Sequence, residues 1–284
     1  MESDKLEAII FEGGGIAGIS YVGVAKALEE LGMLKDVDTF VGSSAGAIFA
    51  GLLSCNANSQ FLEKTIKATN FINFCDGWGS YLGEAYRFSW KMGMYNGDYF
   101  FNWYSQILKE LTGNKDITLS EIYNKYNKEI ILTATDLNNR KTCYLNKDSY
   151  PDLPLALAVR MSMSIPLFFV PVNYAGKYWV DGGYLDNYPF DYIDTYFPNK
   201  NAIGFKLVGV NDDKENVIDG WNSLMTNLIE CSVTKIENLL TREEDEDRTI
   251  NINTFNINTT QFDIKSDDIQ KLIDSGYSEV KKSF

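Results

Sequence analysis

The sequence feature that most constrains this chain is a serine set between two glycines, Gly42-x-Ser44-x-Gly46. The apolar run 38–41 before it predicts a strand, and the Ala-rich run 45–53 after it predicts a helix. A serine in such a turn is lifted clear of the sheet, and the small residues on either side let strand and helix pass closely. The amides that open the helix would then face the charge that develops during nucleophilic attack. The pattern predicts a nucleophilic serine, although an ordinary turn rich in glycine and serine can have the same sequence motif.

The chain has no histidine among its 284 residues, which limits the base that such a serine could use. A Ser-His-Asp triad and a His-ligated zinc site are both excluded. Asp181 is the best candidate base, because it ends the predicted strand 177–180 and precedes Gly182-Gly183, where the chain can turn away sharply. Burial would have to raise its pKa from the usual value of about 3.9. Asp136 and Asp186 remain alternatives, and Asp-Gly-Gly is also a common turn.

A second glycine-rich stretch, Gly13-Gly14-Gly15-x-x-Gly18, follows the predicted strand 8–11 and opens a predicted helix over 17–31. This arrangement fits the dinucleotide-binding fingerprint. However, the second strand lacks the acidic residue expected at its end. A glycine triplet also suits a loop whose amides approach a substrate oxygen, and the Gly14 and Gly15 amides would then form an oxyanion hole beside the serine. A plain tight turn is the third interpretation.

The order of predicted elements indicates an α/β fold with a mostly parallel sheet covered by helices. Further strands are predicted at 129–134, 141–145 (antiparallel), 177–180 and 202–208, with an edge strand at 249–257. Helices are predicted at 61–69, 119–126, 154–163 and 221–240 and from 266 onward, and the acidic run 243–247 is predicted to be a solvated loop. No internal repeat or Pro/Ser-rich linker interrupts the chain. We therefore expect one domain over 1–284, with a core at about 7–208 and with the helices and edge strand of 209–284 packed on it.

The segment 56–106 is dense in aromatic residues, especially between Phe71 and Tyr104. Aromatic clusters are usually core, so the segment is interpreted first as a cap or an insertion with its own small core. The alternative is a surface that contacts acyl chains or membranes.

Charge and cysteine content bound the partners and the compartment. The net charge is -13 and no basic stripe is visible, so we expect no nucleic-acid partner. Four scattered cysteines without metal-ligand spacing indicate reduced thiols, and the acidic start 1–5 does not have the composition of a signal peptide. We expect a cytoplasmic protein that makes only transient, peripheral contact with membranes.

Taken in order, the glycine loop, the Ser44 motif and Asp181-Gly182-Gly183 resemble the patatin-like phospholipase family. Two further stretches, 134–137 and 160–166, also look like that family, as does the continuation of the third motif to Asp186-Asn187-Tyr-Pro189. The resemblance covers roughly residues 7 to 208. It implies a three-layer α/β/α sandwich and a Ser–Asp dyad without histidine.

By this resemblance, Ser44 is the nucleophile, Asp181 the base and the loop from Gly13 to Gly18 the oxyanion hole, with no cofactor, metal or calcium required. The implied activity is the hydrolysis of fatty-acyl esters in phospholipids or other lipids, through an acyl-enzyme. Ala17 stands where many members carry a basic residue, and Glu12 stands where an aspartate is usual. A hydrolase of small esters or acyl thioesters, and a non-catalytic dinucleotide-binding module, remain the alternatives.

Overall fold

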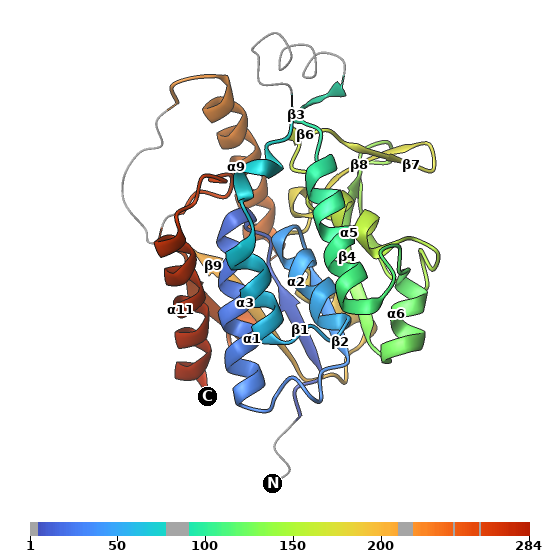
Figure 1. The fold of residues 1–284 in the computed structure, drawn as a ribbon, viewed down its shortest axis with the longest axis vertical. Helices are drawn as coiled ribbons and strands as arrows, with labels where there is room; N and C mark the ends of the chain where they lie inside the picture. Colours follow the sequence, from blue (N-terminus) through green and yellow to red (C-terminus); the bar gives the residue numbers. More distant parts are fainter. Residues whose placement is uncertain (1–4, 78–90, 210–217, 241, 256) are drawn as a thin grey trace.

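A central β-sheet organises the molecule (Figure 1). The computed structural model describes residues 5–77, 91–209, 218–240, 242–255 and 257–284. Among these residues the sheet has eight strands, of which five run parallel in the order β10-β9-β1-β2-β4. These five are β1 (Ala8–Phe11), β2 (Thr39–Gly42), β4 (Glu129–Asp136), β9 (Ala202–Val208) and β10 (Thr249–Asn253). The prediction of a mostly parallel sheet is confirmed.

Three antiparallel strands complete the sheet: β5 (Lys141–Leu145), β7 (Val172–Tyr174) and β8 (Lys177–Asp181). On β4, Ala134 pairs with Cys143 of β5 on one edge and with Asp181 of β8 on the other. Strand β2 lies on the same edge of β4 as β8 but nearer its start, because Gly42 pairs with Leu132. Strands β2 and β8 therefore run toward each other along β4, and their carboxyl ends meet.

Alternating strand residues divide the interior into two cores, as expected when successive side chains point to opposite faces. On β1, Ile9 and Phe11 belong to the larger core, whereas Ala8 and Ile10 belong to the smaller one. The larger core is covered by α1 (Tyr21–Glu30), α2 (Ala45–Ser54), α3 (Ser59–Ala68), α7 (Leu155–Ser162) and α11 (Ser266–Ser283), and the smaller by α8 (Phe190–Tyr196). Figure 1 shows α1, α3 and α11 side by side on the front of the sheet. This confirms the three-layer α/β/α arrangement.

Most of the predicted helices form within a few residues of their expected positions. The helix α6 (Leu119–Tyr126) matches its prediction because Thr118 and Glu121 form a capping box at its start and Asn127, with a φ of 53°, ends it. Two further helices are α5 (Asp98–Thr112), which the sequence does not predict, and α9 (Trp221–Leu240). A small two-stranded sheet joins β3 (Gly93–Tyr95) to β6 (Leu167–Phe169).

The predicted helix over 17–31 is wrong at its start. The glycine loop leads into a 3-10 turn, η1 (Gly15–Ser20), before α1 begins at Tyr21. Gly15 has a φ of 52°, and a Cβ placed on Gly18 would lie 2.6 Å from the Ala45 Cβ, so the turn is held tightly against α2. The edge strand β10 also ends at Asn253, earlier than predicted.

The acidic run 243–247 is exposed at four of its five residues, as predicted, but it is not a loop. It contains the short helix α10 (Glu243–Glu246), and Asp245 is buried. The Asp245 carboxylate accepts hydrogen bonds from Arg242 Nε and Arg248 Nη2, both at 3.0 Å. The arginines on either side of the run supply the charge that lets one of its carboxylates enter the interior.

The aromatic residues of the segment 56–106 that the structure describes join the main core. Phe74, in the 3-10 turn η2 (Phe71–Phe74), packs against Phe100, Trp103 and Phe262 with ring centroids 5.1 to 6.1 Å apart. The prediction of a separate small core is therefore wrong for these rings. The prediction for Trp78, Tyr81, Tyr86, Phe88 and Trp90 lies outside the described residues.

Candidate active site

The turn between β2 and α2 places Ser44 in a conformation that non-glycine residues rarely adopt. Its φ is 50° and its ψ is -117°. A Cβ on Gly46 would overlap the carbonyl of Phe11, and a Cβ on Gly42 would overlap the backbone of Gly46. Both glycines are therefore needed for the close crossing of strand and helix, as the sequence predicts. Strain of this kind is stored where the surrounding structure over-determines the backbone, most often at functional sites.

Ser162, at the end of α7, helps to hold this conformation. The backbone N–H of Ser44 donates a 2.9 Å hydrogen bond to Ser162 Oγ, and both side chains are buried. The sequence alone does not indicate a role for Ser162. The available signal was its place in the run 160–166, which resembles the family, but nothing in that run says which backbone group its hydroxyl would meet.

Asp181 reaches the same place from the opposite direction, because β8 ends where β2 ends. Its backbone N–H donates to Ser164 O and its carbonyl accepts from Thr135 Oγ1, both at 2.9 Å. Its Oδ1 accepts the Gly183 N–H at 2.8 Å. Its Oδ2 is buried and has no hydrogen bond of conventional geometry among the described residues.

Burial raises the pKa of Asp181 to about 7, against two smaller effects in the other direction. The neighbouring Ser44 hydroxyl and the Gly183 N–H both favour the charged carboxylate and lower its pKa. The Ser44 contact is looser than a standard hydrogen bond, since Oδ2 has no partner within hydrogen-bond geometry. Contacts of this kind often tighten when substrate binds.

The two alternative bases do not face Ser44. Asp136 is buried, but its Oδ2 lies 2.8 Å from Lys177 Nζ. Burial opposes this ion pair, yet the bonds from Lys177 and Asn139 hold the pKa of Asp136 at about 2. Burial raises the pKa of Asp186 to about 6, and its carboxylate accepts the Tyr144 hydroxyl at 2.8 Å in a neighbouring cavity that Ser44 does not line.

The glycine loop meets the serine turn, but its four glycines have different positions. The Gly13 N–H donates to Asn187 O at 3.2 Å, and Asn187 Nδ2 donates to Gly13 O at 3.1 Å. Gly13 is thereby removed from the possible oxyanion donors, and Gly18 packs against α2 instead of facing the cavity. Among the described residues, no hydrogen bond uses the N–H of Gly14 or Gly15. These two amides are the candidates that remain.

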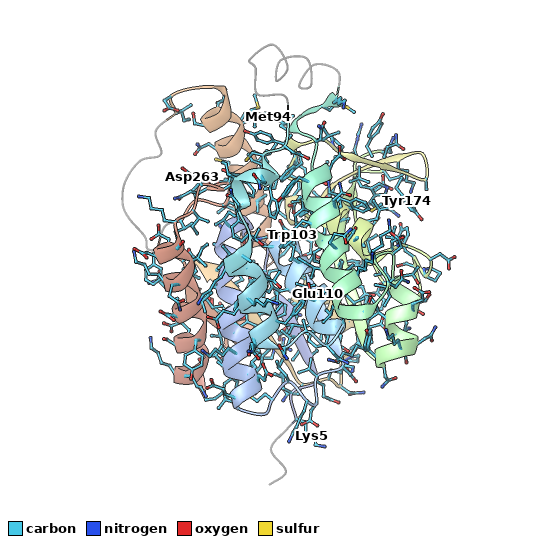
Figure 2. All side chains as sticks on the ribbon, viewed as in Figure 1. Lys5, Met94, Trp103, Glu110, Tyr174 and Asp263 are labelled. Atoms are coloured by element: carbon cyan, nitrogen blue, oxygen red, sulfur yellow. The ribbon has the colours of Figure 1, made fainter. Side chains whose placement is uncertain are left out.

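A cavity of about 140 Å³ brings these groups together, and we call it the Asp181 cavity. It is lined by Ser44, Asp181, Asn187 and the three glycines 13–15, and by the α9 side chains Met225, Ile229 and Val233. Met94, labelled in Figure 2, lines it from β3. In the part of the chain that the structure describes, no cluster of His, Cys, Asp and Glu could hold a metal ion.

A family model described as patatin-like phospholipase matches residues 9–194, well over half of the chain. The chain is a member of the patatin-like phospholipase family. The matched region contains Ser44, Asp181 and the glycine loop, and family membership supports a hydrolase.

Relatives of this family member include viral, bacterial and fungal proteins. The uncharacterized protein R571 of Acanthamoeba polyphaga mimivirus is 29% identical over 215 residues, which are 75% of this chain and 70% of that protein. The probable lipid hydrolase 463L of Invertebrate iridescent virus 6 is 23% identical over 69% of this chain and 66% of that protein. The solved structure of VipD from Legionella pneumophila shares the fold, with a TM-score of 0.71 and 19% identity over 98% of this chain and 66% of that one.

Within the described ranges, no helix is both long enough and apolar enough to cross a bilayer.

Proposed function

We propose that this patatin-like protein is a lipid acyl hydrolase of the phospholipase A type, with Ser44 as nucleophile and Asp181 as base. The observation that carries the proposal is the Asp181 carboxyl group, which is buried beside a serine in a strained turn and has one oxygen without a conventional hydrogen bond. Both side chains line one cavity. A carboxylate with a raised pKa next to a hydroxyl is the arrangement expected of a general base.

In the first half of the proposed reaction, Ser44 Oγ attacks the ester carbonyl carbon while its proton moves to Asp181 Oδ2. The bond to the alcohol then breaks, and the alcohol leaves with that proton. In the second half, a water gives its proton to Asp181 and attacks the acyl-enzyme, and Ser44 takes the proton back as the fatty acid leaves. A pKa of about 7 allows Asp181 to accept and return the proton near neutral pH.

The negative oxygen of each tetrahedral intermediate would be held by the Gly14 and Gly15 amides. Their N–H groups are not used by any hydrogen bond of the described residues, and both glycines line the Asp181 cavity. Removing one such donor typically lowers the rate by about 10²–10³-fold.

We further propose that residues 1–284 act as one catalytic domain without calcium or another cofactor, and that the protein works in the cytoplasm with transient contact at a lipid surface. The support is family membership together with the pairing of β10 with β9, which joins the C-terminal region to the main sheet.

An unchanged rate in the presence of a calcium chelator is the expected result. Activity that rises sharply above the aggregation concentration of the lipid would distinguish a lipid hydrolase from a hydrolase of small esters.

The first experiment is reaction with a fluorophosphonate, followed by intact mass and peptide mapping. One adduct on Ser44 is expected, and Ser44→Ala and Asp181→Asn should each lower kcat by at least about 10³-fold. Asp186→Asn is the matched control, because it alters a buried carboxyl with a raised pKa that does not line the Asp181 cavity. Full activity of either Ser44→Ala or Asp181→Asn would exclude the proposed pair.

A further inference from the structure

A second cavity also reaches Ser44, and the two cavities differ in chemistry. The second, of about 50 Å³, shares Gly15, Ser44 and Ile165 with the Asp181 cavity. Its other walls include Ile48 of α2, Ile66 of α3, Phe74 of η2, Trp103 of α5 and Phe262, and we call it the aromatic cavity. Trp103 is labelled in Figure 2, nearer the middle of the molecule than Met94.

The aromatic cavity offers almost nothing to a polar ligand. Among the described residues that line it, only Ser44 and Trp103 carry a polar side-chain atom. The Trp103 indole N–H is already donated to Thr69 Oγ1 at 3.1 Å. A group that carries unpaired hydrogen-bonding atoms would lose its water there without compensation, so the cavity fits hydrocarbon.

The Asp181 cavity has apolar walls of its own, including Leu167, Phe168 and Ile229, but unlike the aromatic cavity it also contains the groups that an alcohol and a water require. Asp181, Asn187, Tyr184, Glu230, Thr259 and Thr260 line it, and none of these lines the aromatic cavity. In ester hydrolysis, the leaving alcohol and the attacking water each exchange a proton with the base. Both must therefore approach from the side on which Asp181 lies.

From these two contrasts, and resting on the proposed function, we propose that the aromatic cavity binds the first methylene groups of the fatty-acyl chain and that the Asp181 cavity binds the alcohol portion of the ester. The carbonyl carbon then lies at Ser44, where the cavities meet. In the acyl-enzyme, the chain stays among the rings while the alcohol is replaced by water in the Asp181 cavity.

The wall of the aromatic cavity sets the length of chain that enters. Ile66 contributes from α3, and Phe71 and Phe74 contribute from η2. Ile48 lies on α2, about one helical turn beyond Ser44. A larger side chain at position 48 would exclude methylene groups close to the carbonyl, whereas a smaller one at position 66 would admit more of them.

The first test varies one half of the substrate at a time with p-nitrophenyl and other esters. Ile48→Phe should lower the ratio of kcat/KM for octanoate over acetate by about tenfold, because excluding a methylene from an apolar pocket costs 10-fold or more. Ile66→Ala should raise the preference for longer chains. Ile229→Phe, in the wall of the Asp181 cavity, should instead change the preference among alcohols at a fixed acyl chain. Leu228→Phe adds the same ring at a position 55% exposed on α9 and should change neither ratio.

The second test measures binding without turnover. Saturated fatty acids from butanoate to dodecanoate are titrated into Ser44→Ala by calorimetry, alone and combined with Ile48→Phe. Affinity should rise with chain length, and Ile48→Phe should lower the affinity for octanoate about tenfold. This readout separates two failures: chain-length-dependent binding without hydrolysis rejects the proposed reaction but supports the cavity assignment.

Three results would overturn the assignment. One is an acyl preference that changes with Ile229→Phe and not with Ile48→Phe, which would exchange the roles of the two cavities. Another is an octanoate-to-acetate ratio that neither Ile48→Phe nor Ile66→Ala alters, which would make the aromatic cavity a packing void. The last is fatty-acid affinity that does not depend on chain length.

Discussion

Ser44 lies between two regions that are built differently: a turn made of backbone and glycine on one side, and cavity walls made of apolar side chains on the other. In the turn, the atoms in contact are carbonyls and amides, which cannot change when a residue is replaced. In the aromatic cavity, the atoms in contact are rings and methyl groups, which can be exchanged for others of similar volume. The difference implies that the chemistry of the site is fixed by the fold, whereas its substrate preference is adjustable.

The turn allows little freedom because three segments converge within van der Waals contact. Gly46 leaves no room for a Cβ beneath the Phe11 carbonyl, and Gly18 lies against Ala45. The aromatic cavity, by contrast, is bounded by residues from α2, α3, α5 and η2, and its wall consists mainly of their apolar side chains. Volume-conserving exchanges in such walls usually cost less than about 1.5 kcal/mol.

Gly46→Ala is expected to have the largest effect. Overpacking against side chains typically costs about 1–3 kcal/mol, and here the new methyl group meets a backbone carbonyl of β1 that cannot move aside, so we expect a loss of about 4 kcal/mol or more. Urea unfolding measures this loss. Gly220→Ala is the control, because a Cβ there meets nothing within 4 Å. Equal stability of the two variants would show that the turn is not constrained as described.

The local sequence pattern is enough to predict the strand, the turn and the helix around Ser44. It also predicts that Asp181 lies at the end of a strand. That β8 is antiparallel, and so brings Asp181 to the carboxyl end of β2, depends on pairing with β4 far away in the chain. Local pattern carries no information on such pairing.

Side-chain contacts between distant segments were also beyond prediction. The hydrogen bond from Asn187 to Gly13 spans 174 positions, and the bond from Ser44 to Ser162 spans 118. A local example is Asp245, which has an arginine three positions away on either side, but whether these side chains converge on its carboxylate depends on how the chain turns at α10. The sequence does not show whether the aromatic residues of the segment 56–106 form a core of their own or join the main core, because the same residue types are found in both.

Asp181→Asn should reveal the cost of keeping an ionisable base in this turn. Burial raises the pKa of Asp181 to about 7, while its pKa in the unfolded chain is about 3.9. Between these values the folded protein binds the extra proton, so the stabilisation present at pH 4 is lost as pH rises through 7. Asparagine does not ionise, so at pH 8 the variant should be more stable than the unchanged protein by about 2–4 kcal/mol, with little difference at pH 4.

Asp136→Asn supplies a control of opposite sign. The Lys177 and Asn139 bonds hold the pKa of Asp136 at about 2, so its charged form stabilises the fold above pH 4 and that stabilisation is lost as pH falls toward 2. This variant should be less stable than the unchanged protein at neutral pH. Urea midpoints measured from pH 4 to 8 test both signs, and a destabilised Asp181→Asn at pH 8 would contradict the assigned burial.

Ser162→Ala is expected to have the smallest effect, and it tests whether the strained turn is held by one hydroxyl. The variant leaves the Ser44 N–H buried without its acceptor, which should cost about 1–2 kcal/mol of folding free energy. If the lost bond lets the Ser44 backbone relax, the rate of fluorophosphonate labelling should fall about tenfold, in line with that energy.

Ser105→Ala removes a hydroxyl of the same size from an equally buried position. Because Ser105 Oγ is buried without a hydrogen-bond partner among the described residues, its removal should not lower stability and should leave the labelling rate unchanged. A Ser162→Ala protein that loses stability but labels at the normal rate would mean that the glycines alone hold Ser44 in place. A loss of labelling without a loss of stability would mean instead that the hydroxyl acts on the reacting serine and not on the fold.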